Sequence, residues 1–546
     1  MKVRRRHLLF AVLAFALGLA ACEGCRSGAP AWNLQSAGTD PGAPTVRLYL
    51  VSDLAGALEP CGCTRDQLGG LDHFGAWVKA ERPRAPAALV AAAGPLFFMD
   101  EGLGGERAYQ DRAKAEAIAR VLRELRLAAF APGVNDWADD GARGLTRLVD
   151  TAGAAAIAGW SGAPPPFTEQ IVRDIGGIKV GFVGFGQPPA ATNPPTVPNV
   201  EEAVARGVDA AKRQGANVLV ALAAVGRGEA KRIADAVPEL TAIVVGSGKL
   251  NGEGNTSAPQ PERVGDVLVL ETGNHLQSVA VLDLYVREPV TPGHLVKLGD
   301  GTGLELARKR DDLARRIDDL HIKIAGWERD PSIAPADVEA RRRELAELEA
   351  QREGLDVKPA PAKGSFFRYT LKELRPSLGK DPTIETLMLG YYKAVDDHNR
   401  VAFADRLPPP AAPGEAAYVG KDVCTRCHAD ARAVWNGTAH AGAYASLSSQ
   451  FKEFNLECVG CHVTGYERPG GSTVAHVEAL RDVQCEVCHG PGSKHVVTPL
   501  DPTAIVTKPQ PSVCLDCHHS PHVENFDPSL KLREILGPGH GLPAKK

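Results

Sequence analysis

Eight of the twelve cysteines lie after residue 420, arranged in four C-x-x-C-H motifs. Two cysteines three positions apart fall within one helical turn, so both thiols can form thioethers to the vinyl groups of one haem. The histidine that follows can then bind its iron. Zinc knuckles and disulfides are the alternatives, but zinc leaves the four histidines unexplained. The pattern predicts four covalent haem c groups, attached at Cys424, Cys427, Cys458, Cys461, Cys485, Cys488, Cys514 and Cys517, with His428, His462, His489 and His518 as proximal ligands.

Four irons can take up to four more ligands on their distal sides. Six further histidines follow Gly414, namely His440, His476, His495, His519, His522 and His540. His440 lies on a predicted helix after the first motif and His495 follows a Gly-Pro-Gly turn, so these two are the first candidates, and His540 is the next. His519 adjoins a proximal histidine and so faces away from that iron.

Three segments carry a resemblance: VGKDVCTRCHADARAVWNGTAHAGAYASL, ECVGCHVTGY and VQCEVCHGPGSKH. They resemble the tetrahaem cytochrome c that accepts electrons from hydroxylamine oxidoreductase, over residues 418–541. The resemblance implies electron transfer, with a distal histidine at His440 and one haem without a distal protein ligand. The family's next distal histidine is displaced relative to His495.

The elements before this region read as a layered α/β domain. Between residues 45 and 288, short apolar runs such as VRLYLVSD, IKVGFVGF and TAIVVGSG alternate with stretches of helical spacing. Strands that alternate with helices are typical of α/β folds, and such folds place ligands where the strands end. The first strand ends in Asp53, which makes that edge a candidate metal site.

This order resembles the metallophosphoesterase domain of bacterial 5′-nucleotidases, whose site holds two divalent cations. Asp53 and Asn135 keep the family's residue types. The other ligand positions have changed, at Ala55, Pro95, Asp136, Ala224, Ser247 and Lys249. Two cations need about ten to twelve ligand positions between them, mostly imidazole and carboxylate. We therefore expect no divalent metal and no hydrolysis here, and interpret the domain as degenerate.

The N-terminus indicates export. Residues 1–21 combine a basic start with a short apolar run, and Leu19-Ala20-Ala21-Cys22 resembles the lipobox of bacterial lipoproteins. We expect a signal peptide at 1–21, a lipid on Cys22 and a tether at 22–44. The protein would then be anchored to a bacterial membrane, facing the periplasm or the cell surface. The net charge of −4 does not suggest nucleic-acid binding.

The remaining segments complete the predicted organisation. Apolar residues at helical spacing predict an antiparallel helical hairpin at 303–357, followed by a bridging strand and helix at 364–406. A Pro-rich linker at 407–414 then leads to a mostly helical and irregular multihaem c-type cytochrome domain at 415–546. The sequence leaves open whether Cys25, Cys61 and Cys63 are structural, paired, or a small metal or redox site.

We favour an electron carrier over an enzyme. Its partners would be redox cytochromes or a membrane quinol-linked oxidoreductase. One alternative is a haem-based reductase or oxidoreductase of a small nitrogen or sulfur compound. Others are a 5′-nucleotidase-like hydrolase, or an α/β domain that binds a ligand or partner while the haems respond to redox state.

Overall fold

The computed structural model describes residues 41–60, 67–160, 167–188, 199–250, 254–328, 333–353, 361–519, 522–523 and 526–543. Of the two compact units in the chain, one contains Glu305–Val357, and the other combines Gly38–Leu304 with Lys358–Lys546. The predicted signal peptide, Cys22, Cys25, Cys61 and Cys63 lie outside the described residues.

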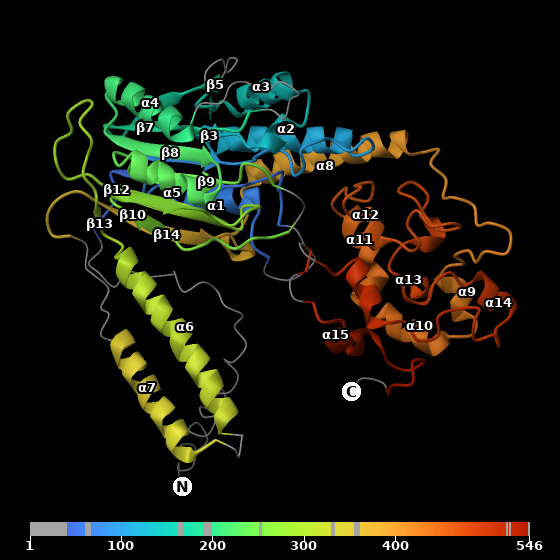
Figure 1. The fold of residues 1–546 in the computed structure, drawn as a ribbon. Helices are drawn as coiled ribbons and strands as arrows, with labels where there is room; N and C mark the ends of the chain where they lie inside the picture. The colour runs from blue at the N-terminus through green and yellow to red at the C-terminus, as the bar shows by residue number, and fades with distance from the viewer. Residues whose placement is uncertain are drawn as a thin grey trace, which may run out of the picture. The chain divides into compact units, whose positions relative to one another are not determined.

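Two β-sheets form the centre of the larger unit (Figure 1). Among the described residues, the first sheet has the order β13 (Gly299–Asp300), β14 (Phe366–Glu373), β12 (Ser278–Tyr285), β1 (Val46–Ser52), β2 (Ala88–Ala93), β3 (Leu127–Ala131), β4 (Ala155–Ile157), β5 (Phe167–Thr168). The second has the order β10 (Glu262–Val264), β11 (Val267–Leu270), β9 (Ala242–Gly246), β8 (Val218–Ala224), β7 (Ile178–Phe185), β6 (Gln170–Ile175).

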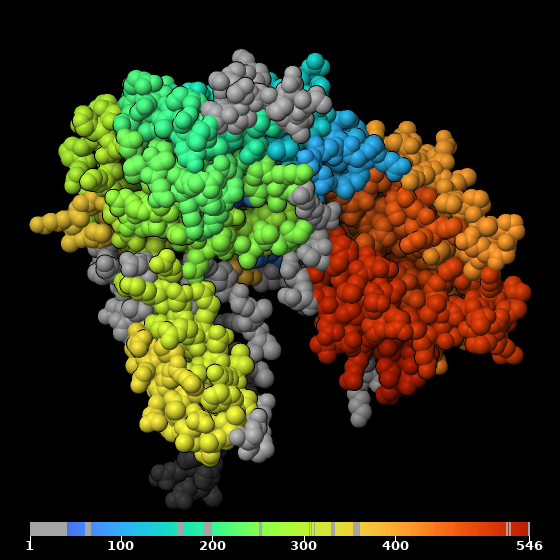
Figure 2. Space-filling view, in the orientation of Figure 1, coloured from blue at the N-terminus to red at the C-terminus, as the bar shows by residue number. Residues whose placement is uncertain are grey.

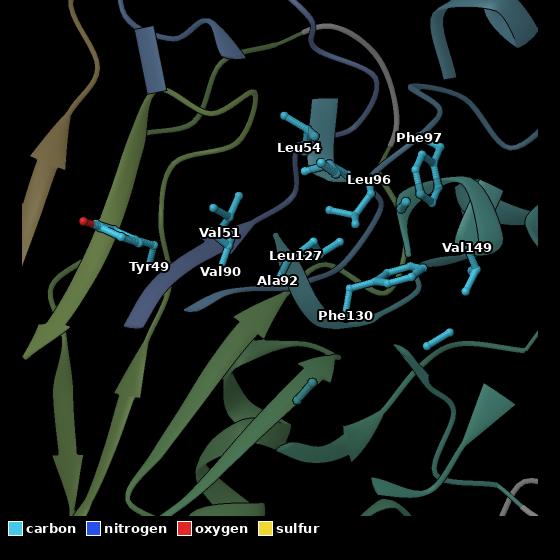
Figure 3. Close-up of a cluster of buried hydrophobic side chains, with 14 of the residues drawn as sticks. Tyr49, Val51, Leu54, Val90, Ala92, Leu96, Phe97, Leu127, Phe130 and Val149 are labelled. Atoms are coloured by element: carbon cyan, nitrogen blue, oxygen red, sulfur yellow. The ribbon is translucent and has the colours of Figure 1, made fainter. Parts of the chain in front are cut away.

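The central strands are mostly apolar because both faces of each sheet are covered there. In β1, Leu48 and Leu50 belong to the cluster between the two sheets, whereas Tyr49 and Val51 belong to the cluster on the helix side. Successive side chains of a strand point to opposite faces, so a strand that is covered on both faces is apolar at successive positions. Figure 3 shows the helix-side cluster, to which β1, β2 and β3 contribute.

Helices cover the outer faces of both sheets, which confirms the layered α/β fold. Helix α8 packs on α1 and α2, and the contact with α1 is close, since a Cβ on Gly75 would lie 2.2 Å from Ile384 Cδ1. The helical elements of this domain are α1 (Leu71–Glu81), α2 (Ala108–Glu124), η1 (Val134–Trp137), α3 (Gly141–Ala152), α4 (Val200–Arg213), α5 (Arg227–Ala236), η2 (Pro376–Leu378) and α8 (Pro382–Ala402).

The strand expected after the hairpin is a full member of the first sheet. β14 pairs antiparallel with β12 along its whole length, from Phe366 opposite Tyr285 to Glu373 opposite Ser278. The segment predicted as a bridge thus supplies both a sheet strand and the helix α8. The domain limits themselves stay predictions.

The smaller unit contains the helices α6 (Leu304–Trp327) and α7 (Pro335–Glu353). Ile317, Leu320 and Ile324 of α6 are buried together with Leu348 of α7. Arg342 pairs with Glu328 at 2.6 Å. Both contacts join residues from opposite arms, as an antiparallel hairpin requires.

The C-terminal region is built of short helices around a small core. Its apolar cluster is Tyr444, Phe454, Val459, Val463, Val474 and Val477. The elements are α9 (Lys421–Thr425), α10 (Ala429–Asn436), η3 (Ala439–Gly442), α11 (Ala443–Ser448), α12 (Val459–His462), η4 (Glu478–Leu480), α13 (Cys485–His489), α14 (Ser493–Val497), η5 (Pro511–Asp516) and α15 (Pro528–Ile535). Within the described part of the chain, we find no helix with the length and apolarity needed to span a bilayer.

Candidate haem-binding region

Each C-x-x-C-H motif adopts a helical turn. The amide of His428 donates to Cys424 O at 3.0 Å, and that of His518 donates to Cys514 O at 2.8 Å. Such a turn places the two thiols and the imidazole of a motif on neighbouring positions of one surface. None of the eight motif cysteines, all of which are described, is in a disulfide, as attachment to a haem requires.

Three proximal histidines each face one of the predicted distal histidines. The ring centroids of His428 and His495 lie 6.2 Å apart, and those of His489 and His540 also lie 6.2 Å apart. The rings of His518 and His440 show the same separation of 6.2 Å. Two imidazoles on opposite sides of one metal ion, with bonds of about 2 Å, hold their ring centroids roughly 6 Å apart. The spacing of all three pairs therefore fits an iron between the rings.

Two further observations agree with metal ligation by these rings. His495 Nδ1 is buried and has no hydrogen-bond partner in the protein, which is unusual for a polar atom unless a ligand is missing. Burial and the neighbouring His518 lower the pKa of His440, and burial lowers the pKa of His518. Both shifts favour the neutral imidazole, which is the form that binds metals.

The fourth proximal candidate, His462, has a different environment. Its Nδ1–H donates to Ala443 O at 2.6 Å, which leaves Nε2 for a metal. His489 is oriented similarly by Val506 O at 2.7 Å. Among the described residues, however, His462 has no ring contact with a second histidine. The arrangement provides one histidine, rather than two, at the second motif.

The other histidines of the region are engaged elsewhere. His476 Nε2 donates to Ala404 O at 2.8 Å. The rings of His519 and His522 lie edge to face, with centroids 5.3 Å apart. His476 is in no ring pair with a proximal histidine within the described residues, and His522 acts electrostatically on Glu457, next to the second motif.

Glu486, inside the third motif, has a structural role that the sequence did not reveal. Its buried carboxylate accepts hydrogen bonds from the amides of Val419 at 3.0 Å, Gly420 at 2.7 Å and Gly492 at 2.7 Å. It thereby ties the chain before the first motif to the third motif. An acidic residue between two attachment cysteines carries no sequence signal for such a contact.

At the end of β1, Asp53 is held by the protein itself. Its carboxylate accepts from Ser247 N at 2.7 Å and from Ser247 Oγ at 2.8 Å. Ser247 stands at one of the positions where the resemblance to the metallophosphoesterase family predicts a histidine. Burial raises the pKa of Asp53 to about 7, although the Ser247 hydrogen bonds oppose that shift.

Asp136 and Asn135 are also engaged within the protein. Asp136 accepts the amides of Leu96 and Phe97, each at 2.8 Å, and burial raises its pKa to about 7. Asn135 Nδ2 donates to Met99 O at 2.6 Å, and its Oδ1 accepts Leu250 N at 3.1 Å.

Across the described ranges, no group of three or more His, Cys, Asp or Glu side chains is arranged to hold a metal. Asp53, Asn135 and Asp136 therefore do not fit a site for two divalent cations.

Comparison with known proteins agrees with this division of the chain. The family described as cytochrome c554 and c-prime matches residues 423–490. Cytochrome c-554 of Nitrosomonas europaea is 35% identical over 94 residues, a match that covers 14% of this chain and 40% of that protein. The C-terminal region is therefore cytochrome c554-like, and haem c is implied there. The match spans less than half of the relative's length.

Solved structures show a likeness in fold to enzymes of the 5′-nucleotidase kind. A 5′-nucleotidase precursor of Thermus thermophilus aligns with a TM-score of 0.42 and 17% identity, covering 73% of this chain and 68% of that one. The sulfate thiohydrolase SoxB of Thermus thermophilus gives 0.38 and 16%, covering 46% and 58%. The NAD nucleotidase of Haemophilus influenzae gives 0.35 and 16%, covering 45% and 54%.

Proposed function

We propose that the protein is a membrane-anchored multihaem c-type cytochrome that acts in electron transfer and carries four haem c groups. The observation that supports this most is the set of three histidine pairs, each with centroids 6.2 Å apart. A haem c supplies a one-electron redox centre when it is bound. Two histidines on one iron leave no open coordination position, which favours electron transfer over bond chemistry.

The second motif supports an alternative activity, the reduction or oxidation of a small nitrogen or sulfur compound. His462 has no distal histidine among the described residues, and a haem held there would keep one free position. The ferric spectrum of the exported protein tests both functions. We expect three low-spin haems and one high-spin haem that binds nitric oxide. Four low-spin haems would rule out the reductase, and two or more high-spin haems would contradict the histidine pairing.

We propose that the α/β domain is catalytically inactive as a phosphoesterase. The engagement of Asp53 by Ser247 and of Asp136 by backbone amides supports this. The test is an assay of the full chain on nucleotides with added manganese or zinc, beside the variant Asp53→Ala. We expect no turnover in either protein. Turnover in the wild type that is lost in Asp53→Ala would overturn the proposal.

The proposed location is the outer side of a bacterial membrane, with a lipid on Cys22 and a face toward the periplasm or cell surface. The electron partners would be other cytochromes or a membrane quinol-linked oxidoreductase. Replacing Cys22 with Ser should move the exported protein from the membrane fraction to the soluble fraction. Retention of the variant in the membrane would contradict the lipid anchor.

A further inference from the structure

Residues 452–457, here called the lead-in segment, run directly into Cys458 of the second motif. The α/β domain holds this segment through paired amides. Gln110 Nε2 of α2 donates to Asn455 Oδ1 at 3.2 Å, and Gln110 Oε1 accepts Leu456 N at 3.0 Å. Gln110 and Asn455 are both buried. In the space-filling view, the blue atoms of α2 adjoin the orange atoms of the C-terminal half of the chain (Figure 2).

An ion pair fastens the last residue of the lead-in segment. Lys114 Nζ of α2 lies 2.6 Å from one carboxylate oxygen of Glu457 and 2.8 Å from the other, and Arg107 Nη2 lies 3.2 Å from the first. Burial alone would raise the pKa of Glu457, but Lys114 and Arg107 outweigh burial and keep it below its ordinary value. Glu457 therefore carries a charge directly beside a haem-attachment cysteine.

Helix α8 and the loop before α1 add further contacts to the same segment. Asn399 Nδ2 of α8 donates to Phe454 O at 2.8 Å. Lys452 Nζ donates to Glu59 Oε2 at 2.5 Å. Of the four motifs, within the described residues, only the second has flanking chain bonded to α2 and α8 in this way. In the part of the chain that the structure describes, it is also the motif whose histidine is in no ring pair with a second histidine.

We propose that α2 acts as a positioning element for the second motif. Lys114, through Glu457, fixes the chain before Cys458 and sets the electrostatic potential at the group that His462 binds. The inference rests on the proposed function, because it requires a haem at His462. Arg107 also contacts Glu457, so the charges form a cluster: removing Lys114 makes this cluster more negative, and removing Glu457 makes it more positive. A negative charge stabilises the oxidised form of a nearby haem, and a positive charge stabilises the reduced form.

The experiment uses the full exported chain in a redox titration with optical detection. The variants are Lys114→Met, Glu457→Gln and the double variant. Glu239→Gln is the matched control, because it removes an ion pair with Lys212 of α4, within the α/β domain. The double variant Cys458→Ser/Cys461→Ser cannot attach the second haem. The part of the titration curve that is missing in this variant therefore belongs to the second haem, whatever the spin state of that haem.

We expect Lys114→Met to favour the oxidised form of the second haem, and Glu457→Gln to favour its reduced form. Each should change the ratio of the two forms by about tenfold at a fixed ambient potential, since one charge roughly 10 Å away acts through an effective dielectric of about 20. The double variant should return close to the wild type. The potentials of the other three haems should not change, and the Glu239→Gln control should leave all four potentials unchanged.

Shifts of the same sign, shifts of all four haems together, or no shift would overturn the inference. If Lys114→Met loses haem, the mass of the exported chain decides. Loss of one haem supports positioning of the second motif, and loss of all four contradicts it. If the component of the second haem is missing from the titration of the wild-type chain, the proposed function is contradicted. If that component is present in the wild type but does not shift in Lys114→Met and Glu457→Gln, only this inference is contradicted.

Discussion

The end of β1 and the C-terminal region both carry side chains that could bind a metal ion, but these side chains differ in whether they form hydrogen bonds within the protein. At the end of β1, Asp53 accepts two hydrogen bonds from Ser247, and Asp136 accepts backbone amides. In the C-terminal region, imidazole pairs face each other across 6.2 Å, and His495 Nδ1 is buried without a partner. The carboxylates at the end of β1 thus find their hydrogen-bond partners within the protein, whereas the paired imidazoles leave the width of a metal ion between them.

The largest expected effect comes from removing one attachment pair. Cys514→Ser/Cys517→Ser leaves no thiol to bond to one haem, so the exported chain should lose the mass of one haem. Mass spectrometry with a haem stain measures this. Asp53→Ala, at the end of β1, is the control and should keep all haem. An unchanged mass in the cysteine variant would contradict the attachment.

Removing a distal histidine should change one haem without losing it. In His495→Leu, the partner of His428 is gone, and one low-spin haem should become high-spin in the ferric spectrum. His476→Leu is the control, because His476 bonds to Ala404 O and faces no proximal histidine. A spectrum unaltered by His495→Leu would show that another group binds that iron.

Gly94→Ala tests how tightly the residues around Asp53 are packed. An added Cβ would lie 1.9 Å from Asp53 Oδ1, and Gly94 has a φ of +85°. We expect a loss of about 3 kcal/mol in the free energy of unfolding, from the clash and the left-handed backbone together. The control is Gly226→Ala, with a φ of −63° and nothing within 4 Å of the added carbon. Equal thermal midpoints for the two variants would argue for an open cavity at Asp53.

The last prediction concerns the pH dependence of stability that Asp53 confers. Its pKa in the folded protein is about 7, raised by burial, so ionisation costs stability. The cost is absent below the pKa of an unfolded carboxyl, about 4, grows as pH rises, and is complete above about 7. Asp53→Asn should remove it, and should gain up to about 4 kcal/mol relative to wild type at pH 8 but not at pH 4. Melting curves at both pH values measure this, and a constant difference would contradict the raised pKa.

Features that depend on residues close together in the sequence could be predicted from it. The C-x-x-C-H motifs form helical turns, and His440, His495 and His540 are the histidines that face proximal rings. Which proximal ring each one faces was not predictable, because the partners come from different segments. The hydrogen bonds of Glu486 to backbone amides, and the ion pair between Lys114 and Glu457, could not be predicted for the same reason. Asp136 stands at one of the changed ligand positions, and its hydrogen bonds to backbone amides depend on a loop geometry that no motif encodes.

The pairing of β13 with β14 determines where the segment that carries α6 and α7 is attached to the sheet. Asp300 of β13 lies opposite Phe367 of β14, and its carboxylate accepts the amides of Thr302, Gly303 and Leu304, where α6 begins. The chain thus leaves the sheet and returns to it at neighbouring strands. Because β13 and β14 run parallel, the segment between them is a crossover connection, which can be exchanged for another of sufficient length while the ladder between β12 and β14 stays intact.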